Sequence, residues 1–364
     1  MLHDKTIAVV VPAYNEASQI GMVLKRMPEF VDRIVVVNDA STDNTAEIVT
    51  KYLEKSNQTI KKRKRTVEKT PYNKAEQVLA EMDQKEWSLF TPSRVVNKTP
   101  EEDRIILINH EKNASVGGAI ATGYKWCKDH KIDITAVMAG DGQMDPDELE
   151  GICMPIINDP TIDYVKGNRL SHRSAFFVIP RIRYFGNSIL SLLTKIASGY
   201  WRVSDTQTGY TAISLPALEA IRLHNIYKSY GCPNDILVKL NIAFCHVKEV
   251  PIKPVYEVGE QSKMKVFKVI PRITWLLFKA FWKRLYVKYL FRDFHPLFLL
   301  YHLSFFLLII NIPFLFQVVT SLSPEVVLGT QNLLIFVFLT ISGLQTLFFA
   351  MWMDMMDNDR LHVA

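Results

Sequence analysis

The stretch Ile134–Pro146, ITAVMAGDGQMDP, is the clearest indication of the fold of this chain. It begins with a short apolar run typical of a buried strand, and a turn that carries the carboxylate of Asp141 follows at once. The segments around it read as helices, so the sequence predicts an α/β fold: a mostly parallel, Rossmann-like sheet flanked by helices. Three further apolar runs end in polar residues in the same way: Ile7–Val11 before Tyr14-Asn15-Glu16, Ile34–Val37 before Asn38-Asp39, and Ile105–Ile108 before Asn109.

Because the carboxyl ends of parallel strands meet at one edge of a sheet, these polar clusters should form one crevice. Thr42 and Asp145 are explained at least as well by helix N-caps as by a ligand. Asp39 and Asp141 follow strands directly and are not expected to cap anything. Gly118, the second residue of a glycine pair, could let the backbone approach a phosphate, although the chain has neither a P-loop nor a strand-linked GxGxxG.

The C-terminal quarter of the chain is typical of a membrane protein. Residues 296–319 and 326–353 carry no formal charge, and a bilayer is crossed by ~20 apolar residues. We expect two transmembrane helices within 295–353, at about 296–319 and 331–353, followed by a tail at 354–364. A buried hairpin in a soluble core is the alternative, but its helices would be uncharged on every face.

A basic, aromatic stretch at 263–294 precedes these spans. Nine Lys or Arg and no Asp or Glu lie between Lys263 and Arg292, interleaved with Trp, Phe and Tyr. This pattern indicates a helix that binds anionic lipid headgroups rather than nucleic acid, and the positive-inside rule places it, the catalytic domain and both termini in the cytoplasm. The apolar pattern at 180–198 fits an interfacial helix and a core-facing helix equally well.

Five motifs carry a resemblance to a known family: VVVPAYNEASQI (Val9–Ile20), VVVNDASTDNT (Val35–Thr45), NASVGGAIATGY (Asn113–Tyr124), AGDGQMDP (Ala139–Pro146) and SDTQTGYTAI (Ser204–Ile213). Together they resemble family 2 glycosyltransferases of the GT-A fold. More narrowly, they are similar to the polyprenyl-phosphate sugar synthases, the group of dolichol-phosphate mannose synthase and the bactoprenol glucosyltransferases. The likeness covers residues 5–50 and 104–263 and implies a catalytic domain at 1–262. An insertion at about 54–103, with a helix expected near 73–87, departs from the family pattern.

The resemblance implies a nucleotide-sugar site formed by Pro12, Ala13, Tyr14, Asn15, Glu16, Asp39, Gly118, Asp141 and Gln143. Asp141 matches the last Asp of the family's DxD motif and Gln143 the Gln that often follows it, so both are implied ligands of Mg²⁺ or Mn²⁺. The first position of that motif is Ala139 here, which leaves the remaining ligands to substrate phosphates and water. The metal would stabilise the charge on the departing diphosphate.

The acceptor implied by the resemblance is a polyprenyl phosphate, bound by Arg169, Arg202, Thr208 and Lys263. A phosphate monoester is already anionic at neutral pH, so a single displacement with inversion needs no strong general base. The implied catalytic residues are Asp141, Asp205, Arg202 and Asp235, although Asp235 is also explained by the start of a helix.

Two other functions stay open at this point. A processive polysaccharide synthase would also belong to family 2, but the chain has no QxxRW motif and only two expected spans. A catalytically silent membrane adaptor would explain Ala139. The basic run Lys61–Arg65 in the insertion could contact lipid or a second protomer, but a solvated charge run is the simpler interpretation.

Overall fold

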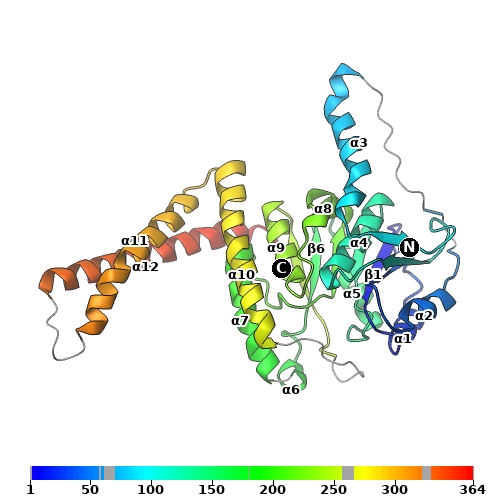
Figure 1. Cartoon of the computed structure of the whole chain (residues 1–364), viewed down its shortest axis with the longest axis horizontal. Helices are drawn as coiled ribbons and strands as arrows, with labels where there is room; N and C mark the ends of the chain where they lie inside the picture. Colours follow the sequence, from blue (N-terminus) through cyan, green and yellow to red (C-terminus); the bar gives the residue numbers. More distant parts are fainter. Residues whose placement is uncertain are drawn as a thin grey trace.

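The computed structural model describes residues 2–56, 59–60, 70–179, 181–255, 266–321 and 329–363. Figure 1 shows an α/β body from which a long helical hairpin projects on one side and a single helix, α3, on another. The expected fold class, a mostly parallel sheet followed by two long apolar helices, is confirmed.

One nine-stranded sheet forms the centre of the body, in the order β3-β4-β2-β1-β5-β7-β6-β8-β9. Strands β4, β2, β1 and β5 are parallel, whereas β7 runs antiparallel to both of its neighbours and β3 antiparallel to β4. The strands are β1 Ile7–Ala13, β2 Arg33–Asn38, β3 Ser93–Val95, β4 Ile105–His110, β5 Ile134–Val137, β6 Tyr164–Asn168, β7 Thr211–Ser214, β8 Val247–Pro251 and β9 His362–Val363.

Both faces of this sheet are covered, which is why its central strands read as continuous apolar runs. In β1, Ala8 and Val10 join the core under α4, α8 and α9, while Val9 and Val11 join the core under α1, α2 and α5. This alternation follows from the two-residue repeat of a strand. The covering helices are α1 Ile20–Lys25, α2 Thr45–Lys51, α4 Val116–Asp129, α5 Leu149–Asn158, α8 Leu215–Ala220 and α9 Cys232–Ile242.

The register brings the strand ends together. Ala13 pairs with Asn38, and Asn38 pairs with Asn109, to which its side chain also donates a hydrogen bond of 3.0 Å. Since β7 is antiparallel to both β5 and β6, β6 runs in the same direction as β5 and ends at the same edge, at Asn168. All the predicted strand-end clusters therefore lie along one edge of the sheet.

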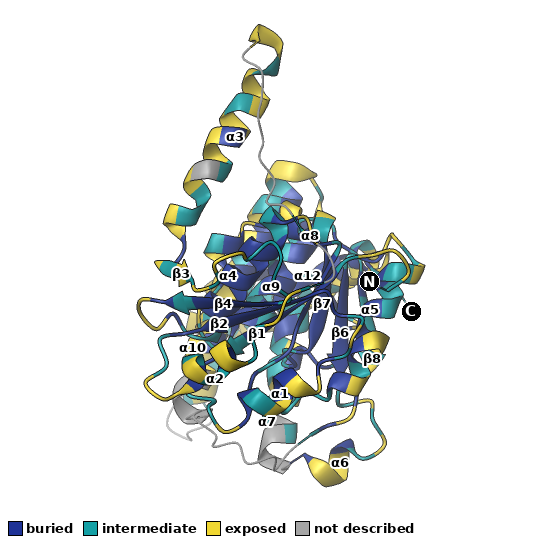
Figure 2. Ribbon diagram, turned by 90° about the vertical axis from the view of Figure 1, so that its right-hand side faces the viewer, coloured by how far each residue is buried: buried dark blue, intermediate teal, exposed yellow. Residues whose placement is uncertain are grey.

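The helix expected near 73–87 is confirmed as α3, Lys74–Glu86, between short 3-10 turns at Pro71–Asn73 and Trp87–Leu89. It projects from the body with much of its surface exposed (Figure 2). Its base is held to α4 by a buried Lys125, which forms ion pairs with Glu86 (2.8 Å) and Asp129 (2.6 Å). The basic run Lys61–Arg65 lies outside the described residues.

The helices next to the hairpin are α6 Ala175–Val178, α7 Arg181–Ser198, α10 Val266–Tyr286 and the π-helix η5 Val287–Arg292. In Figure 1, α7 and α10 lie side by side at the base of the hairpin, and they pack on each other. Ile189 and Leu192 of α7 are exposed, as are Trp275 and Phe278 of α10, whereas Phe281 is buried. Helix α7 thus has one face packed on α10 and one exposed apolar face, and contact of the exposed face with a membrane stays a prediction.

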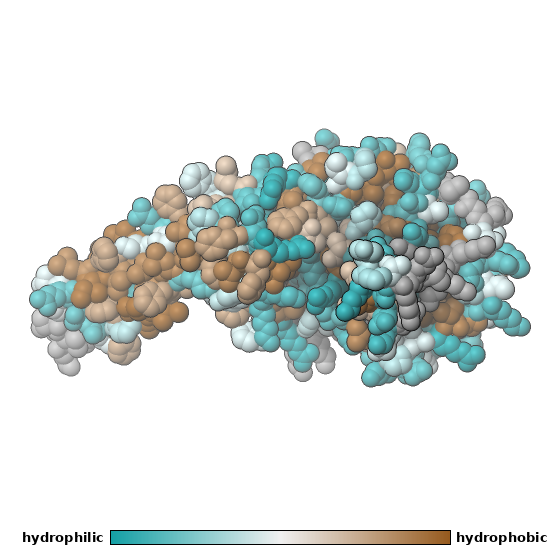
Figure 3. Space-filling model, turned by 90° about the horizontal axis from the view of Figure 1, so that it is seen from above, coloured by the Kyte–Doolittle hydropathy of each residue, from teal (hydrophilic) through white to brown (hydrophobic). Residues whose placement is uncertain are grey.

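Two helices, α11 Leu297–Thr320 and α12 Thr330–Asp359, are long and apolar enough to cross a bilayer. Figure 3 shows the hairpin as a predominantly hydrophobic surface beside a largely hydrophilic body.

The expected tail at 354–364 is corrected by the structure. Helix α12 continues to Asp359, and His362–Val363 then adds β9 to the edge of the sheet, paired with Val247–Lys248. The reason is that Asp354 and Asn358, which read as solvated tail residues, are 0% and 2% exposed. The end of the chain is an integral part of the α/β body.

Candidate active site

The loops after β1 and β2 form one wall of the crevice. The N–H of Asn15 donates to the hydroxyl of Ser41 (3.0 Å), and the Asn15 side-chain oxygen accepts from the N–H of Thr42 (2.8 Å). The N–H of Glu16 donates to the hydroxyl of Thr45 (2.9 Å). Asn15 has a positive φ of 55°, a conformation that Asn tolerates better than most residues. These bonds fix the two loops relative to each other.

The residues before this wall connect it to the acidic turn. The carbonyl of Pro12 accepts from the N–H of Gly140 (3.3 Å), and the carbonyl of Ala13 accepts from the N–H of Asp39 (2.9 Å). Tyr14, in contrast, is 38% exposed. Three strand-end loops are therefore joined by backbone hydrogen bonds, with one aromatic ring open to solvent.

Asp39 is almost fully buried, and its Oδ1 accepts from the N–H of Ala114 (2.7 Å) and contacts Nδ1 of His110 (2.7 Å). Nε2 of His110 in turn contacts the hydroxyl of Thr122 (2.9 Å). Asp39 does not cap α4, whose N-cap is Ser115, but it holds the loop that enters this helix. His110 was missed, although its place directly after an apolar run was a visible signal.

The glycine pair at the start of α4 is explained by packing. A Cβ at Gly118 would lie 2.5 Å from the Cβ of Ala114, and one at Gly117 would lie 2.0 Å from the carbonyl oxygen of Tyr227. Neighbouring residues of the chain itself fill the space that a side chain would need. This close approach accounts for both glycines without a phosphate.

The acidic turn after β5 divides into two parts. Oδ1 of Asp141 accepts from the N–H of Gln143 (3.0 Å) across Gly142, whose φ is +76°, and both polar side chains are half-buried. Asp145 accepts from the N–H of Asp147 (3.2 Å) and begins the 3-10 turn Pro146–Glu148, which confirms its cap role. Within the described residues, no group of three or more His, Cys, Asp or Glu side chains has a metal-binding arrangement.

Farther along the same edge of the sheet, just after β6, Arg169 forms a two-pronged ion pair with Asp205. Nε of Arg169 lies 2.8 Å from Oδ2 of Asp205, and Nη2 lies 3.1 Å from Oδ1. Asp205 is fully buried and also accepts from the N–H of Thr208 (3.2 Å). Burial alone would raise the pKa of Asp205, but Arg169 and Lys166 outweigh it and hold that pKa below its ordinary value. The structure thus brings together three predicted site residues: Arg169, Asp205 and Thr208.

Glu249 of β8, which was not predicted from the sequence, holds the backbone on which Asp205 lies. Its Oε1 accepts from the N–H groups of Ser204 (2.9 Å) and Asp205 (3.0 Å), and its Oε2 accepts from the side chain of Asn168 (3.1 Å). Burial raises the pKa of Glu249 above its ordinary value. A charged residue inside the strand sequence VKEVP was the available signal.

Lys166 of β6 is a second missed residue, and it makes stability depend on pH. Its Nζ donates to the carbonyl of Thr208, and burial lowers its pKa from 10.5 to about 8. Below pH 8 the lysine is protonated in both states, and the folded state bears the full cost of burying the charge. Between pH 8 and 10.5 the folded protein releases this proton first, so the free energy of unfolding should rise with pH, by about 3 kcal/mol in total.

We expect this rise in the wild type to exceed that of Lys166→Met when denaturant unfolding is measured in detergent at about pH 7.5 and pH 10. Lys288, whose pKa burial also lowers to about 8, is present in both proteins, so its titration cancels in the comparison. If the free energy of unfolding rose equally with pH in the wild type and in Lys166→Met, Lys166 would have its ordinary pKa in the folded protein.

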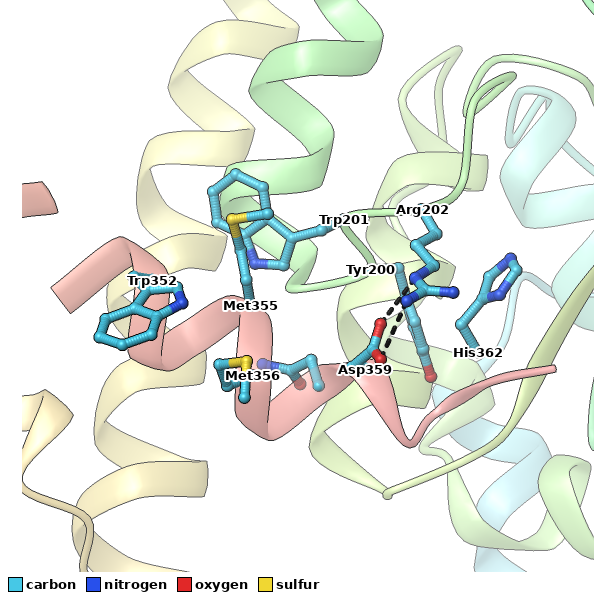
Figure 4. Close-up of a pocket in the computed structure, with 9 residues that line it drawn as sticks. Tyr200, Trp201, Arg202, Trp352, Met355, Met356, Asp359 and His362 are labelled. Atoms are coloured by element: carbon cyan, nitrogen blue, oxygen red, sulfur yellow. Dashed lines mark hydrogen bonds and ion pairs between the residues drawn. The ribbon is translucent and has the colours of Figure 1, made fainter. Parts of the chain in front are cut away.

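Two predicted residues, Arg202 and Asp235, are not brought to the Arg169–Asp205 pair. Arg202 forms an ion pair with Asp359 at the end of α12 (2.6 Å from Nε to Oδ1; Figure 4). Asp235 lies in the first turn of α9, where it accepts from the N–H of Tyr227 (2.8 Å) and pairs with Lys239. Its contacts support the start-of-helix interpretation. Lys263 lies outside the described residues.

The fold is an α/β sheet with polar residues along the carboxyl ends of its strands, joined to a hairpin of two long apolar helices. Residues 8–81 match the family Glycosyl transferase family 2. A UDP-N-acetylglucosamine–dolichyl-phosphate N-acetylglucosaminyltransferase of Methanococcus voltae is 30% identical over 254 residues, 70% of this chain and 87% of that protein. The chain belongs to glycosyltransferase family 2, and it is a glycosyltransferase.

More distant similarities include an undecaprenyl-phosphate mannosyltransferase of Micrococcus luteus, 23% identical over 71% of this chain and 87% of that protein. Among solved structures, the fold is similar to that of the glucosyl-3-phosphoglycerate synthase of Mycobacterium tuberculosis in complex with UDP. The similarity covers 77% of this chain and 80% of the chain of that enzyme. Its sequence identity is 17% and its TM-score 0.46.

Proposed function

We propose that this glycosyltransferase moves a sugar from a nucleoside-diphosphate sugar to a polyprenyl phosphate, with inversion, at a membrane surface. The observation that carries the proposal is a juxtaposition: the Asp141 turn and the Arg169–Asp205 pair lie at the same edge of one sheet. Family membership and relatives that act on dolichyl and undecaprenyl phosphates support it.

The donor would lie along the wall formed by Pro12–Glu16 and Asp39. The carboxylate of Glu16 can accept hydrogen bonds from N–H and O–H groups of base and ribose, and the buried Asp39 would support this wall through its bond to Ala114. The partly exposed ring of Tyr14 would then be available to stack on the base.

The residues of the acidic turn fit a divalent cation held in part by the substrate. Asp141 supplies one carboxylate and Gln143 an amide oxygen, both half-buried. A single carboxylate with phosphate oxygens and water is an ordinary environment for Mg²⁺, and Mn²⁺ accepts the same oxygen ligands. Such a cation, when bound, would stabilise negative charge on the departing diphosphate.

The acceptor phosphate would bind at Arg169 and Thr208, with Lys263 as a further cation. Asp205 holds the guanidinium of Arg169 in one orientation, and a fixed planar guanidinium suits paired phosphate oxygens. Since the phosphate is already an anionic nucleophile, these residues need only position it in line with the donor. In this proposal α11 and α12 cross the membrane, and α10 lies among the lipid headgroups, with the crevice facing the cytoplasm.

A transfer assay tests the proposal. Membranes containing the protein are incubated with a panel of radiolabelled nucleotide sugars, added polyprenyl phosphate, and Mg²⁺ or Mn²⁺. The expected product is an organic-soluble, mild-acid-labile lipid that carries the label. Absence of this product across the whole panel would contradict the proposal and favour the adaptor function.

Arg169→Lys keeps the positive charge but loses the planar fork. We expect the KM for polyprenyl phosphate to rise about tenfold or more, with a smaller change in kcat, because the lost contacts bind the acceptor. The matched control is Arg173→Lys, an exposed arginine four residues farther along. An unchanged KM for the acceptor in Arg169→Lys would remove Arg169 from the acceptor site.

A further inference from the structure

A cavity of about 260 Å³ lies where the end of α12 meets the α/β body. It is lined by Trp352, Met355 and Met356 of α12 and by Trp201, Arg202 and His362 of the body, with Tyr200, Asn358 and Asp359. Figure 4 shows the apolar side chains toward one side and Arg202, Asp359 and His362 toward the other. The cavity therefore has one wall for hydrocarbon and one for a charged group.

Two buried polar atoms in this lining lack a partner within the described part of the chain: Nε1 of Trp201 and Nδ1 of His362. A buried indole N–H without an acceptor costs roughly 1–3 kcal/mol, so proteins rarely leave one unsatisfied. Burial and the nearby Arg202 lower the pKa of His362, so its ring is neutral at pH 7 and can donate from Nδ1. Two residues of the lining, from separate segments, thus carry a buried donor without a partner among the described residues.

Arg202 adds a charged donor to these two. Its side chain is 59% exposed and is paired through Nε and Nη2 with the carboxylate of Asp359, at 2.6 and 3.0 Å. A carboxylate is an anion with paired oxygens, as a phosphate is, so Asp359 occupies the position that an exogenous phosphate would take on the guanidinium. The two anions would compete for the same arginine.

Relative to a membrane, the cavity begins at the headgroup layer and extends past its outer boundary. Trp352 lies at the end of the uncharged run, and Asp359 lies seven residues, about 10 Å, farther along the helix axis. The headgroup layer of each leaflet is about 5–7 Å thick, and Trp is enriched at its boundary. Trp352 and Met356 are 58% and 65% exposed, so they can contact lipid chains beside the span.

We propose that this cavity binds the phosphate of an anionic phospholipid, which accepts hydrogen bonds from Trp201, Arg202 and His362 while its chains lie against Trp352, Met355 and Met356. The site is separate from the acceptor site at Arg169. It holds a lipid of the surrounding bilayer rather than the substrate.

Opposite effects of two substitutions test this assignment. The purified full-length protein in zwitterionic detergent is titrated with short-chain phosphatidylglycerol, and bound lipid is counted by native mass spectrometry. Arg202→Gln should weaken binding about tenfold or more, whereas Asp359→Asn should strengthen it, because the competing carboxylate is gone. If the ion pair were merely structural, both substitutions would act in the same direction, and that result would overturn the proposal.

Trp201→Phe separates a lipid site from a packing role. Removal of an unsatisfied N–H should leave the protein as stable or more stable, yet phosphatidylglycerol should bind several-fold more weakly. Unchanged binding would exclude the indole from the site. Arg360→Gln, an exposed arginine on the same terminal segment, is the matched control and should bind as the wild type does.

Three competitor arms identify the source of the phosphate. Phosphatidylcholine should compete poorly, since its choline would add a cation beside Arg202. Inorganic phosphate that binds as tightly as phosphatidylglycerol would overturn the lipid assignment. Displacement of phosphatidylglycerol by equimolar polyprenyl phosphate would make this an acceptor site and would overturn the proposal as well.

Discussion

Asp141→Asn is expected to lower the rate of sugar transfer by about 10²–10³-fold at saturating Mg²⁺ or Mn²⁺, with little change in stability. The asparagine oxygen can still accept the hydrogen bond from the N–H of Gln143 that the carboxylate accepts at 3.0 Å. The turn should therefore keep its shape, while the negative charge that would hold a cation beside the diphosphate is lost. The measurement is kcat in the lipid-product assay, together with the metal concentration for half-maximal activity.

Asp147→Asn is the matched control for this prediction. Asp147 lies six residues beyond Asp141 and 73% of its side chain is exposed, so its substitution removes an equal charge from the same surface. We expect near wild-type transfer from it. If Asp141→Asn transferred sugar as well as Asp147→Asn does, the role of Asp141 in holding a metal would be contradicted. A parallel loss in both would point to the net charge of the turn.

Arg284→Met is expected to destabilise the protein by about 3–5 kcal/mol, the largest effect on folding anticipated for one substitution. Arg284 of α10 and Asp354 of α12 form a two-pronged ion pair at 2.7 and 2.8 Å, and both side chains are 0% exposed. The substitution leaves the carboxylate of Asp354 buried without its counter-charge.

The same arginine also holds the end of α7. Its Nε donates to the carbonyl of Ala197 (2.9 Å) and its Nη2 to that of Ile196 (3.1 Å), carbonyls that the helix end would otherwise leave unsatisfied. Gly199 has a φ of +80°, and a Cβ there would lie 2.7 Å from Nη1 of Arg284. One guanidinium therefore joins three elements: helices α7 and α10 and the end of α12.

Thermal unfolding in detergent measures this effect, and a double substitution distinguishes its cause. Arg284→Met with Asp354→Leu removes both charges, so it should recover much of the stability lost in the single variant. Lys279→Met, an exposed lysine on the same helix, is the control and should change stability little. If the double variant were no more stable than Arg284→Met, the loss would come from the α7 contacts rather than from an unpaired buried charge.

The fold class could be predicted because its signals are local. Buried parallel strands read as apolar runs, and Ile7–Val11 and Ile34–Val37 became β1 and β2 almost unchanged. The uncharged runs became α11 and α12 for the same reason. The signals in the acidic turn were also local. Pro146 favours the first position of a helical turn, so the sequence already indicated that Asp145 is an N-cap and that Asp141 is not.

Local patterns in the sequence were thus enough to predict the sheet, the hairpin, and the edge of the sheet where the polar strand ends meet. The pairing of the charged side chains became visible only in the folded chain. Arg169 pairs with Asp205 across 36 positions, Arg202 with Asp359 across 157, and Arg284 with Asp354 across 70. A strand or helix is set by the periodicity of neighbouring residues, whereas an ion pair depends on how distant elements pack, and no local pattern in the sequence records that packing.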